Sequence, residues 1–216
     1  MAQQPRLLIL NGSERAGGNT DFMVDRAGQT AIARGAKVSR IDLRNYRIEP
    51  CGPCGDCNIR LQPCSIDDDV PFIVDQIAAA DALIYAVPVH GFGMAEIMQR
   101  FIERAGVGYM RFSRPLANKV GSAIVTGRRY NHEHVLSQLI FNMLLNRMII
   151  AGAGYPPIVH GGAPGSAAND EEGVDVVEAS VKRVVDVVRF IAEGPTPELL
   201  DMDSANERML KVGVQP

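Results

Sequence analysis

Short apolar runs and longer amphipathic segments alternate along this chain, which predicts strands and helices in turn. The first run, Leu7-Leu8-Ile9-Leu10, ends in Gly12-Ser13, and this is typical of a buried parallel strand that enters a loop. The longer segments repeat apolar residues at helical spacing. We expect strands over residues 6–11, 38–43, 82–87, 119–126 and 148–153, and helices over residues 19–35, 67–80, 94–105, 134–146 and 173–192.

This order of elements predicts one α/β domain. Strands that alternate with helices, without internal repeats, form a parallel sheet covered on both faces, and right-handed crossovers leave few arrangements. We therefore expect a doubly wound sheet of five strands. The length of 216 residues suits one domain over residues 1–194. Within it lies a long loop over residues 44–69, and residues 195–216 follow it as a tail.

Composition and charge exclude several classes of function. Hydrophobic residues make up 46% of the chain and charged residues 22%, which is a globular balance with enough apolar material for one core. The net charge is -3 and the basic residues are scattered, so we expect no nucleic-acid partner. No apolar run approaches the ~20 residues of a membrane helix, and no signal peptide is evident, so we expect a cytoplasmic protein.

The loop after the first strand, over residues 11–20, has the chemistry of an anion site. In open α/β sheets, ligands bind beyond the carboxyl ends of the strands, and this loop ends at a helix N-terminus that favours negative charge. Ser13, Asn19 and Thr20 can donate hydrogen bonds to a phosphate, and Arg15 can add a charge-assisted contact. The glycine spacing matches neither a P-loop nor a dinucleotide fingerprint, so a mononucleotide is the natural guest. The alternative is an ordinary Gly-rich turn before a capped helix.

All four cysteines lie in one segment, as Cys51, Cys54, Cys57 and Cys64. In a reducing compartment such a cluster indicates metal ligands or redox groups rather than a disulfide framework. The two-residue gaps allow three thiolates to converge on one iron-sulfur cluster while the fourth comes from a following turn, so we favour a [4Fe-4S] cluster. Structural zinc, a redox-active thiol pair, and cysteines that bind nothing are the alternatives.

The stretch Gly12 to Thr20 resembles the Gly-Ser-x-Arg-x-x-Gly-Asn-Thr loop of the NADPH-dependent FMN reductase superfamily. The resemblance extends over residues 7–105 and includes the run Pro88-Val89-His90-Gly91-Phe92-Gly93. It implies a flavodoxin-like sheet of strand order 2-1-3-4-5 and an FMN cofactor. The flavin-binding residues that it implies are Ser13, Arg15, Gly18, Asn19 and Thr20 in the first loop, Pro88, Val89, His90, Gly91 and Phe92 in the second, and Thr126, Gly127 and Arg128 in the third.

The cysteine segment closely resembles that of the iron-sulfur flavoprotein branch of this superfamily, which follows the second strand. By that resemblance, all four cysteines are cluster ligands. The resemblance also implies a homodimer or homotetramer.

These observations predict an FMN-dependent oxidoreductase or electron-transfer flavoprotein. Hydride and electron transfer demand no nucleophile, acid or base, so we assign no catalytic residue. NAD(P)H is a possible reductant, and a redox partner protein or a small quinone-like molecule is the expected acceptor. The alternatives are a flavin-only NAD(P)H-dependent quinone or FMN reductase, and a non-catalytic redox-sensing or zinc-binding interaction protein. We interpret His132 and His134 as an exposed helix start.

Overall fold

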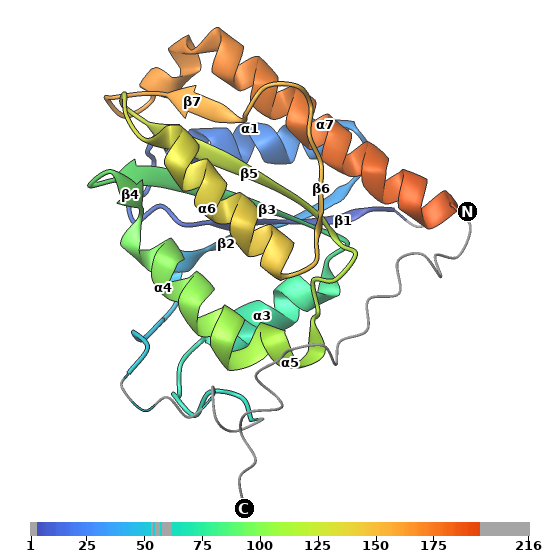
Figure 1. The fold of residues 1–216 in the computed structure, drawn as a ribbon. Helices are drawn as coiled ribbons and strands as arrows, with labels where there is room; N and C mark the ends of the chain where they lie inside the picture. Colours follow the sequence, from blue (N-terminus) through green and yellow to red (C-terminus); the bar gives the residue numbers. More distant parts are fainter. Residues whose placement is uncertain (1–3, 53, 55–56, 58–61, 195–216) are drawn as a thin grey trace, which may run out of the picture.

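The computed structural model describes residues 4–52, 54, 57 and 62–194, so the predicted tail over residues 195–216 lies outside the described residues. The described chain forms a central sheet flanked by helices (Figure 1). Its elements are β1 (Arg6–Asn11), α1 (Asn19–Ala33), β2 (Lys37–Asp42), η1 (Leu43–Asn45), α3 (Val70–Ala79), β3 (Ala82–His90), β4 (Gly93–Met94), α4 (Glu96–Ala105), η2 (Gly106–Met110), α5 (Arg111–Ser113), β5 (Val120–Gly127), α6 (His132–Leu145), β6 (Ile149–Ile150), β7 (Ile158–His160), η3 (Ser166–Asn169) and α7 (Glu171–Glu193).

The parallel strands occur in the order β2-β1-β3-β5-β6. Leu7 of β1 lies opposite Ala82 of β3, which in turn lies opposite Val120 of β5, so the three central strands run in step. Counted by position, this is the order 2-1-3-4-5, and the predicted flavodoxin-like fold is confirmed.

The predicted fifth strand over residues 148–153 is wrong in extent. Only β6, two residues long, pairs with the beginning of β5, and a separate strand, β7, pairs with the end of β5. Between them the chain reads Gly152-Ala153-Gly154-Tyr155-Pro156-Pro157. Proline has no N–H for the ladder, and Gly154 has a φ of 109°, so this segment leaves the sheet edge before the chain returns to it.

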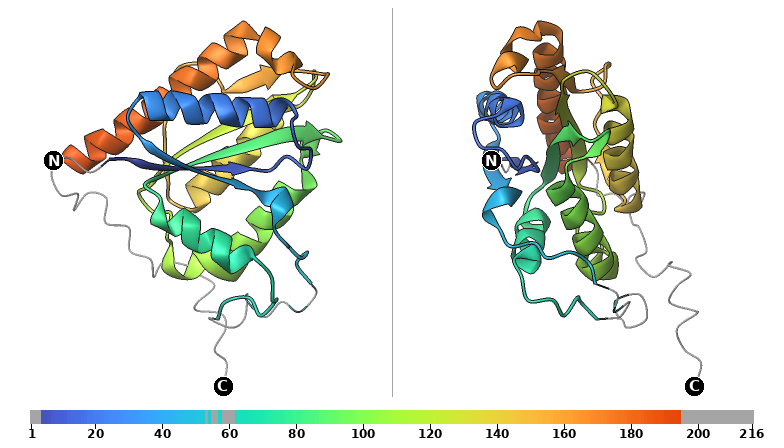
Figure 2. Two further views of the ribbon diagram at one scale, coloured as in Figure 1. Left: turned by 180° about the vertical axis from the view of Figure 1, so that it is seen from behind. Right: turned by 90° about the vertical axis from the view of Figure 1, so that its left-hand side faces the viewer.

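Side chains of the central strands alternate between two cores. Leu8 and Leu10 of β1 face the core shared with α3, α4 and α6, whereas Leu7 and Ile9 face the core shared with α1 and α7. Figure 2 shows the sheet between these two helical layers. The apolar runs of the central strands β1, β3 and β5 are therefore continuous, because these strands are buried on both faces.

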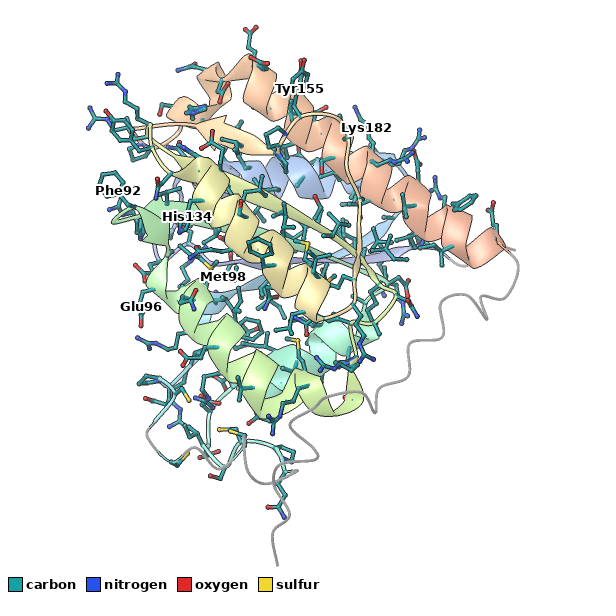
Figure 3. All side chains as sticks on the ribbon, viewed as in Figure 1. Phe92, Glu96, Met98, His134, Tyr155 and Lys182 are labelled. Atoms are coloured by element: carbon teal, nitrogen blue, oxygen red, sulfur yellow. The ribbon has the colours of Figure 1, made fainter. Side chains whose placement is uncertain are left out.

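The helices of the described residues include none that is long and apolar enough to cross a membrane. The longest of the described helices, α7, is too polar for a membrane span because only one of its faces is apolar. Val177, Val181 and Val184 are buried along one stripe. The other face is polar: Lys182 lies on the outer surface in Figure 3 and forms an ion pair with Glu178. This polar face is that of a helix packed on a sheet.

The strand β3 extends beyond the predicted residues 82–87 and turns back on itself. Val89 and His90 pair antiparallel with β4 through a tight hairpin. The two residues at the tip, Gly91 and Phe92, have φ values of 53° and 64°, as a two-residue turn of this hand requires. The hairpin carries the second predicted flavin loop past the carboxyl edge of the sheet.

Candidate functional site

A cavity of ≈ 520 Å³ opens at the carboxyl ends of β1, β3 and β5. This volume lies within the range of small-molecule sites, roughly 300–1,000 Å³. Every predicted flavin-binding residue except Phe92 lines it, and the chain adds three residues that the sequence did not reveal. The lining residues are Ser13, Arg15, Gly18, Asn19, Thr20, Pro88, Val89, His90, Gly91, Thr126, Gly127, Arg128, Gly161, Gly162 and Pro164.

The N-terminus of α1 faces this cavity without a side-chain cap. Gly18 precedes the helix in extended conformation, and no side chain accepts a capping hydrogen bond there. The N–H of Phe22 is the first to bond within the helix, to the Gly18 carbonyl. The earlier N–H groups and the positive end of the helix dipole are thus suited to a phosphate.

A buried network holds the first loop in place. The Asp21 carboxylate accepts hydrogen bonds from the Gly17 N–H at 2.7 Å and from both Arg44 Nη atoms at 2.9 and 3.0 Å. Asn11, at the end of β1, donates to Asp21 at 2.5 Å and accepts from the Ser13 N–H at 3.0 Å. The loop is therefore tied at both ends to the sheet edge and to its own helix.

Asp21 stays ionised in this network. Burial opposes its charge, but hydrogen bonds from Arg44, Gly17 and Asn11 outweigh that effect and lower its pKa. Arg44 is thereby committed to bracing the loop rather than to a ligand. Sequence reasoning missed this network, because the partner of Arg44 is 23 residues away and is fixed only by the packing of α1 beside β2.

The predicted phosphate donors also shape the cavity through bonds to the protein itself. The Thr20 and Thr126 hydroxyls meet at 2.6 Å and link the first and third loops. Asn19 donates to the Ala163 carbonyl at 2.9 Å and accepts from the Ala167 N–H at 3.1 Å. The Ser13 hydroxyl bonds to the backbone of Arg15. Backbone N–H groups are therefore the principal donors left for a phosphate.

A fourth segment, over residues 161–164, closes the cavity after β7. The Gly161 N–H donates to the Gly127 carbonyl at 2.8 Å. A Cβ on Gly161 would lie 2.6 Å from the Asn19 Nδ2 and 2.9 Å from the Ala167 nitrogen, so only glycine fits this close approach. The paired glycines of the sequence were the available signal, but the misplaced fifth strand left them in an unassigned stretch.

Residues of the hairpin lie at different depths. His90 is half-buried, with its Nδ1 3.8 Å from the Glu14 carboxylate. Phe92 is 65% exposed and stacks on Tyr130 of the third loop, with ring centroids 6.1 Å apart. Figure 3 shows Phe92 at the tip of the β3–β4 hairpin, and Phe92 is not among the residues that line the cavity. The Asn131 amide donates to the Phe92 carbonyl and joins the two loops.

The expectation of an exposed helix start at His132 is wrong. Its side chain packs inward against the His160 ring, with centroids 4.6 Å apart, and it is 2% exposed. Burial lowers its pKa, so the ring is neutral at neutral pH. A Cβ on Gly127 would lie 2.7 Å from the His132 Nε2, so His132 supports the third loop from behind. His134, two residues further along α6, is exposed as expected.

The four cysteines lie in the loop that joins η1 to α3. Cys51 and Cys54 are exposed, Cys57 is buried and Cys64 is intermediate. In the part of the chain that the structure describes, no three cysteine, histidine or acidic side chains are gathered as a metal site. Burial raises the pKa of Cys57, and the neighbouring thiols Cys64 and Cys54 raise it further. Four thiols within one loop are the donor type that iron-sulfur clusters take, although the described side chains are not gathered around one point.

A π-helical turn, η2, fixes the position of the Cys64 backbone. The Cys64 N–H donates to the Gly108 carbonyl at 3.0 Å, and the Tyr109 hydroxyl donates to the Cys64 carbonyl at 3.2 Å. Both partners belong to η2, where π geometry frees carbonyls from the usual helical ladder. A Cβ on Gly108 would lie 2.9 Å from the Cys64 Cβ, so glycine is needed there.

Comparison with known proteins agrees with this arrangement. A model of the family of NADPH-dependent FMN reductases matches residues 5–163, which contain all four cavity segments up to Ala163. The chain belongs to this family. As a member of the NADPH-dependent FMN reductase family, it is a flavin-dependent oxidoreductase.

Two proteins to which this chain is similar are named iron-sulfur flavoproteins. One, from Methanocaldococcus jannaschii, is 30% identical over 193 residues, which cover 86% of this chain and 98% of the relative. Another, from Methanosarcina thermophila, is 29% identical and covers 84% of this chain and 94% of the relative. The solved structure of RosB with a bound riboflavin-5'-phosphate derivative has the same fold, with a TM-score of 0.69, 18% identity, and coverage of 88% and 81%.

Substitution of Gly161 by alanine should weaken FMN binding. The new Cβ would push Asn19 and the backbone of Ala167 apart, so we expect at least a tenfold loss of affinity, which is about 1.4 kcal/mol. Titration of apoprotein with FMN, followed by flavin fluorescence, measures the change. Gly152→Ala is the matched control, because a Cβ there meets nothing within 4 Å. Equal affinities for the two variants would contradict this role of Gly161.

Substitution of Asp21 by asparagine should destabilise the protein in a pH-dependent way. The folded-state pKa of Asp21 lies below its ordinary value of 3.8, so its contribution is complete above that value and is lost as the pH falls through the lower folded value. We expect a loss of about 2 kcal/mol at neutral pH, because ionic hydrogen bonds are broken. This loss should shrink under acid conditions in urea denaturation.

Asp25→Asn is the control for this experiment. Asp25 pairs with Arg40, as Asp21 does, but its side chain is 63% exposed. An exposed pair contributes about 0–1 kcal/mol. A difference between wild type and Asp21→Asn that stays constant across the acid range would show that the ionised carboxylate does not brace the loop.

Proposed function

We propose that this family member is an FMN-dependent electron-transfer oxidoreductase that carries a [4Fe-4S] cluster on Cys51, Cys54, Cys57 and Cys64. The observation that carries the proposal is the pairing of two sites in one chain. One is a cavity at the carboxyl edge with an uncapped helix N-terminus. The other is a loop between η1 and α3 that carries all four cysteines of the chain.

Different segments of the cavity bind the phosphate and the ring system of FMN. The N-terminus of α1 and the backbone of the first loop bind the phosphate, with Arg15 at the exposed rim. The hairpin residues Pro88 to Gly91 and the third loop, Thr126 to Arg128, contact the ring system. FMN, when bound, supplies the chemistry, because it accepts two electrons from a donor such as NAD(P)H and gives them up singly.

This chain's own groups orient the flavin and adjust its surroundings. The linked hydroxyls of Thr20 and Thr126 keep the first and third loops at a fixed separation. Arg128 lines the cavity on the third loop and would offer positive charge to the flavin ring. His132, neutral and buried behind Gly127, adds no charge there. No acid or base is required, so no further side chain need carry a proton.

The cluster has a role distinct from that of the flavin. The thiolates of Cys51, Cys54, Cys57 and Cys64 would hold it in the loop between η1 and α3, and a cluster there would supply one-electron transfer to an acceptor, either a redox protein or a small quinone-like molecule. Assembly as a homodimer or homotetramer in the cytoplasm belongs to this proposal, because it would bring the cluster of one chain near the flavin of another. The relatives named iron-sulfur flavoproteins support the cluster.

Anaerobic purification followed by absorption spectroscopy and iron analysis tests the proposal. We expect flavin bands over broad additional absorption, about four irons with matching acid-labile sulfide per chain, and loss of both iron and sulfide, but not of flavin, in Cys64→Ser. Flavin without iron would show a flavin-only quinone or FMN reductase. Zinc in place of iron, or protein that takes up no FMN, would favour the interaction protein.

A further inference from the structure

His132, the first residue of α6, is a buried imidazole with a nitrogen that bonds to nothing in the described protein. The residue is 2% exposed. Its Nε2 is buried and has no hydrogen-bond partner among the described residues. A buried polar atom without a partner costs free energy, and an apolar side chain in the same place would avoid that cost. Packing alone therefore does not account for an imidazole at this position.

This nitrogen lies against the backbone that forms the wall of the cavity. A Cβ on Gly127 would lie 2.7 Å from the His132 Nε2 and 3.2 Å from the Val89 Cβ, so the three residues meet closely. Gly127 and Val89 both line the cavity, one from the third loop and one from the hairpin. Because Gly127 has no side chain, the imidazole packs directly on the third loop. A charge on His132 would act on the contents of the cavity through a medium of low dielectric constant.

The groups around His132 leave room for a charge that appears only when the cavity becomes negative. Burial lowers the pKa of His132 most, and His160 lowers it further, whereas the Gly127 backbone, Glu133 and Asp170 raise it. The His160 ring of β7 lies 4.6 Å from the His132 ring, and its Nδ1 lies 3.3 Å from the Asp170 carboxylate at the start of α7. Burial is thus the main opposition to a positive charge, and a negative charge in the cavity would offset it.

We propose, on the basis of the flavin site proposed above, that His132 binds a proton at Nε2 when the flavin in the cavity is reduced. Electron transfer itself requires no proton from the protein, so this role is additional to the proposed function. In the neutral ring, a hydrogen on Nδ1 leaves the lone pair on Nε2, and a proton from solvent added there gives an imidazolium. A hydride from the reductant makes the flavin ring negative, and the imidazolium offsets that charge. Each two-electron reduction therefore takes one proton from solvent onto His132.

The test measures the two-electron midpoint potential of bound FMN in the full chain from about pH 6 to about pH 8, where histidine titrates. For a two-electron couple, a tenfold change in proton concentration shifts the potential by ~30 mV for each proton taken up. The wild type takes up two protons, one with the hydride and one on His132, so we expect ~60 mV per pH unit. His132→Gln has a side chain of similar length that binds no proton, and we expect its slope to fall to ~30 mV per pH unit.

Two further variants serve as controls. His134→Gln removes an exposed histidine from the same helix, and it should keep the wild-type slope. His160→Gln removes the neighbouring ring, and it should also keep the steep slope if the proton resides on His132. Nitrogen chemical shifts of the histidine rings, measured in the oxidised and the reduced protein, report the protonation of His132 directly. Circular dichroism and bound flavin report whether each variant is folded.

A slope of ~30 mV per pH unit in the wild type would overturn the proposal. A steep slope that persists in His132→Gln would do the same, because the flavin or another group would then hold the proton. Loss of the steep slope in His160→Gln would assign the proton to His160 instead. If His132→Gln does not fold, the ring shifts of the wild type decide, and a His132 ring that stays neutral in the reduced protein contradicts the proposal. Wild-type protein that binds no FMN would instead refute the flavin site, and the role of His132 with it.

Discussion

The parallel register of the three central strands is the constraint on which the cavity depends. Asn11 at the end of β1 lies opposite Ala86 of β3, and Pro88 lies opposite Thr126 of β5. Neighbouring strands are about 4.8 Å apart, so the first, second and third loops begin within one small region of the sheet edge. A slip of one residue would exchange the two buried faces of a strand, and the two cores exclude it.

Loops built on this edge still have to be fixed, and the chain uses buried charge at two places to do so. Asp21 and Arg44 brace the first loop from beneath, and Asp68 and Arg104 anchor the cysteine loop. In both pairs a carboxylate also accepts backbone N–H groups, so that the loop backbone is bound directly. Arg44 is therefore not a free positive charge for an anion, because both of its Nη atoms already bond to Asp21.

Much of the fold and of the cavity followed from the sequence, because the relevant signals are local. The apolar runs predicted the strands, and the loop from Ser13 to Thr20 together with Pro88 to Gly91 predicted two walls of the cavity. Gly161 and its neighbours were missed, because two prolines divide the fifth strand and no periodicity reveals where the chain returns. The partners of Arg44 and Arg104, and the burial of His132, depend on contacts between distant segments that a single sequence does not encode locally.

The proposed flavin site depends most on the N-terminus of α1 receiving the phosphate of FMN. Calorimetric titration of the apoprotein with FMN and with riboflavin measures that contribution directly, because the two ligands share the ring and differ only in the phosphate. If the helix N-terminus binds the phosphate, we expect FMN to bind at least tenfold more tightly than riboflavin, a difference of about 1.4 kcal/mol or more. Equal affinity for the two ligands would contradict it.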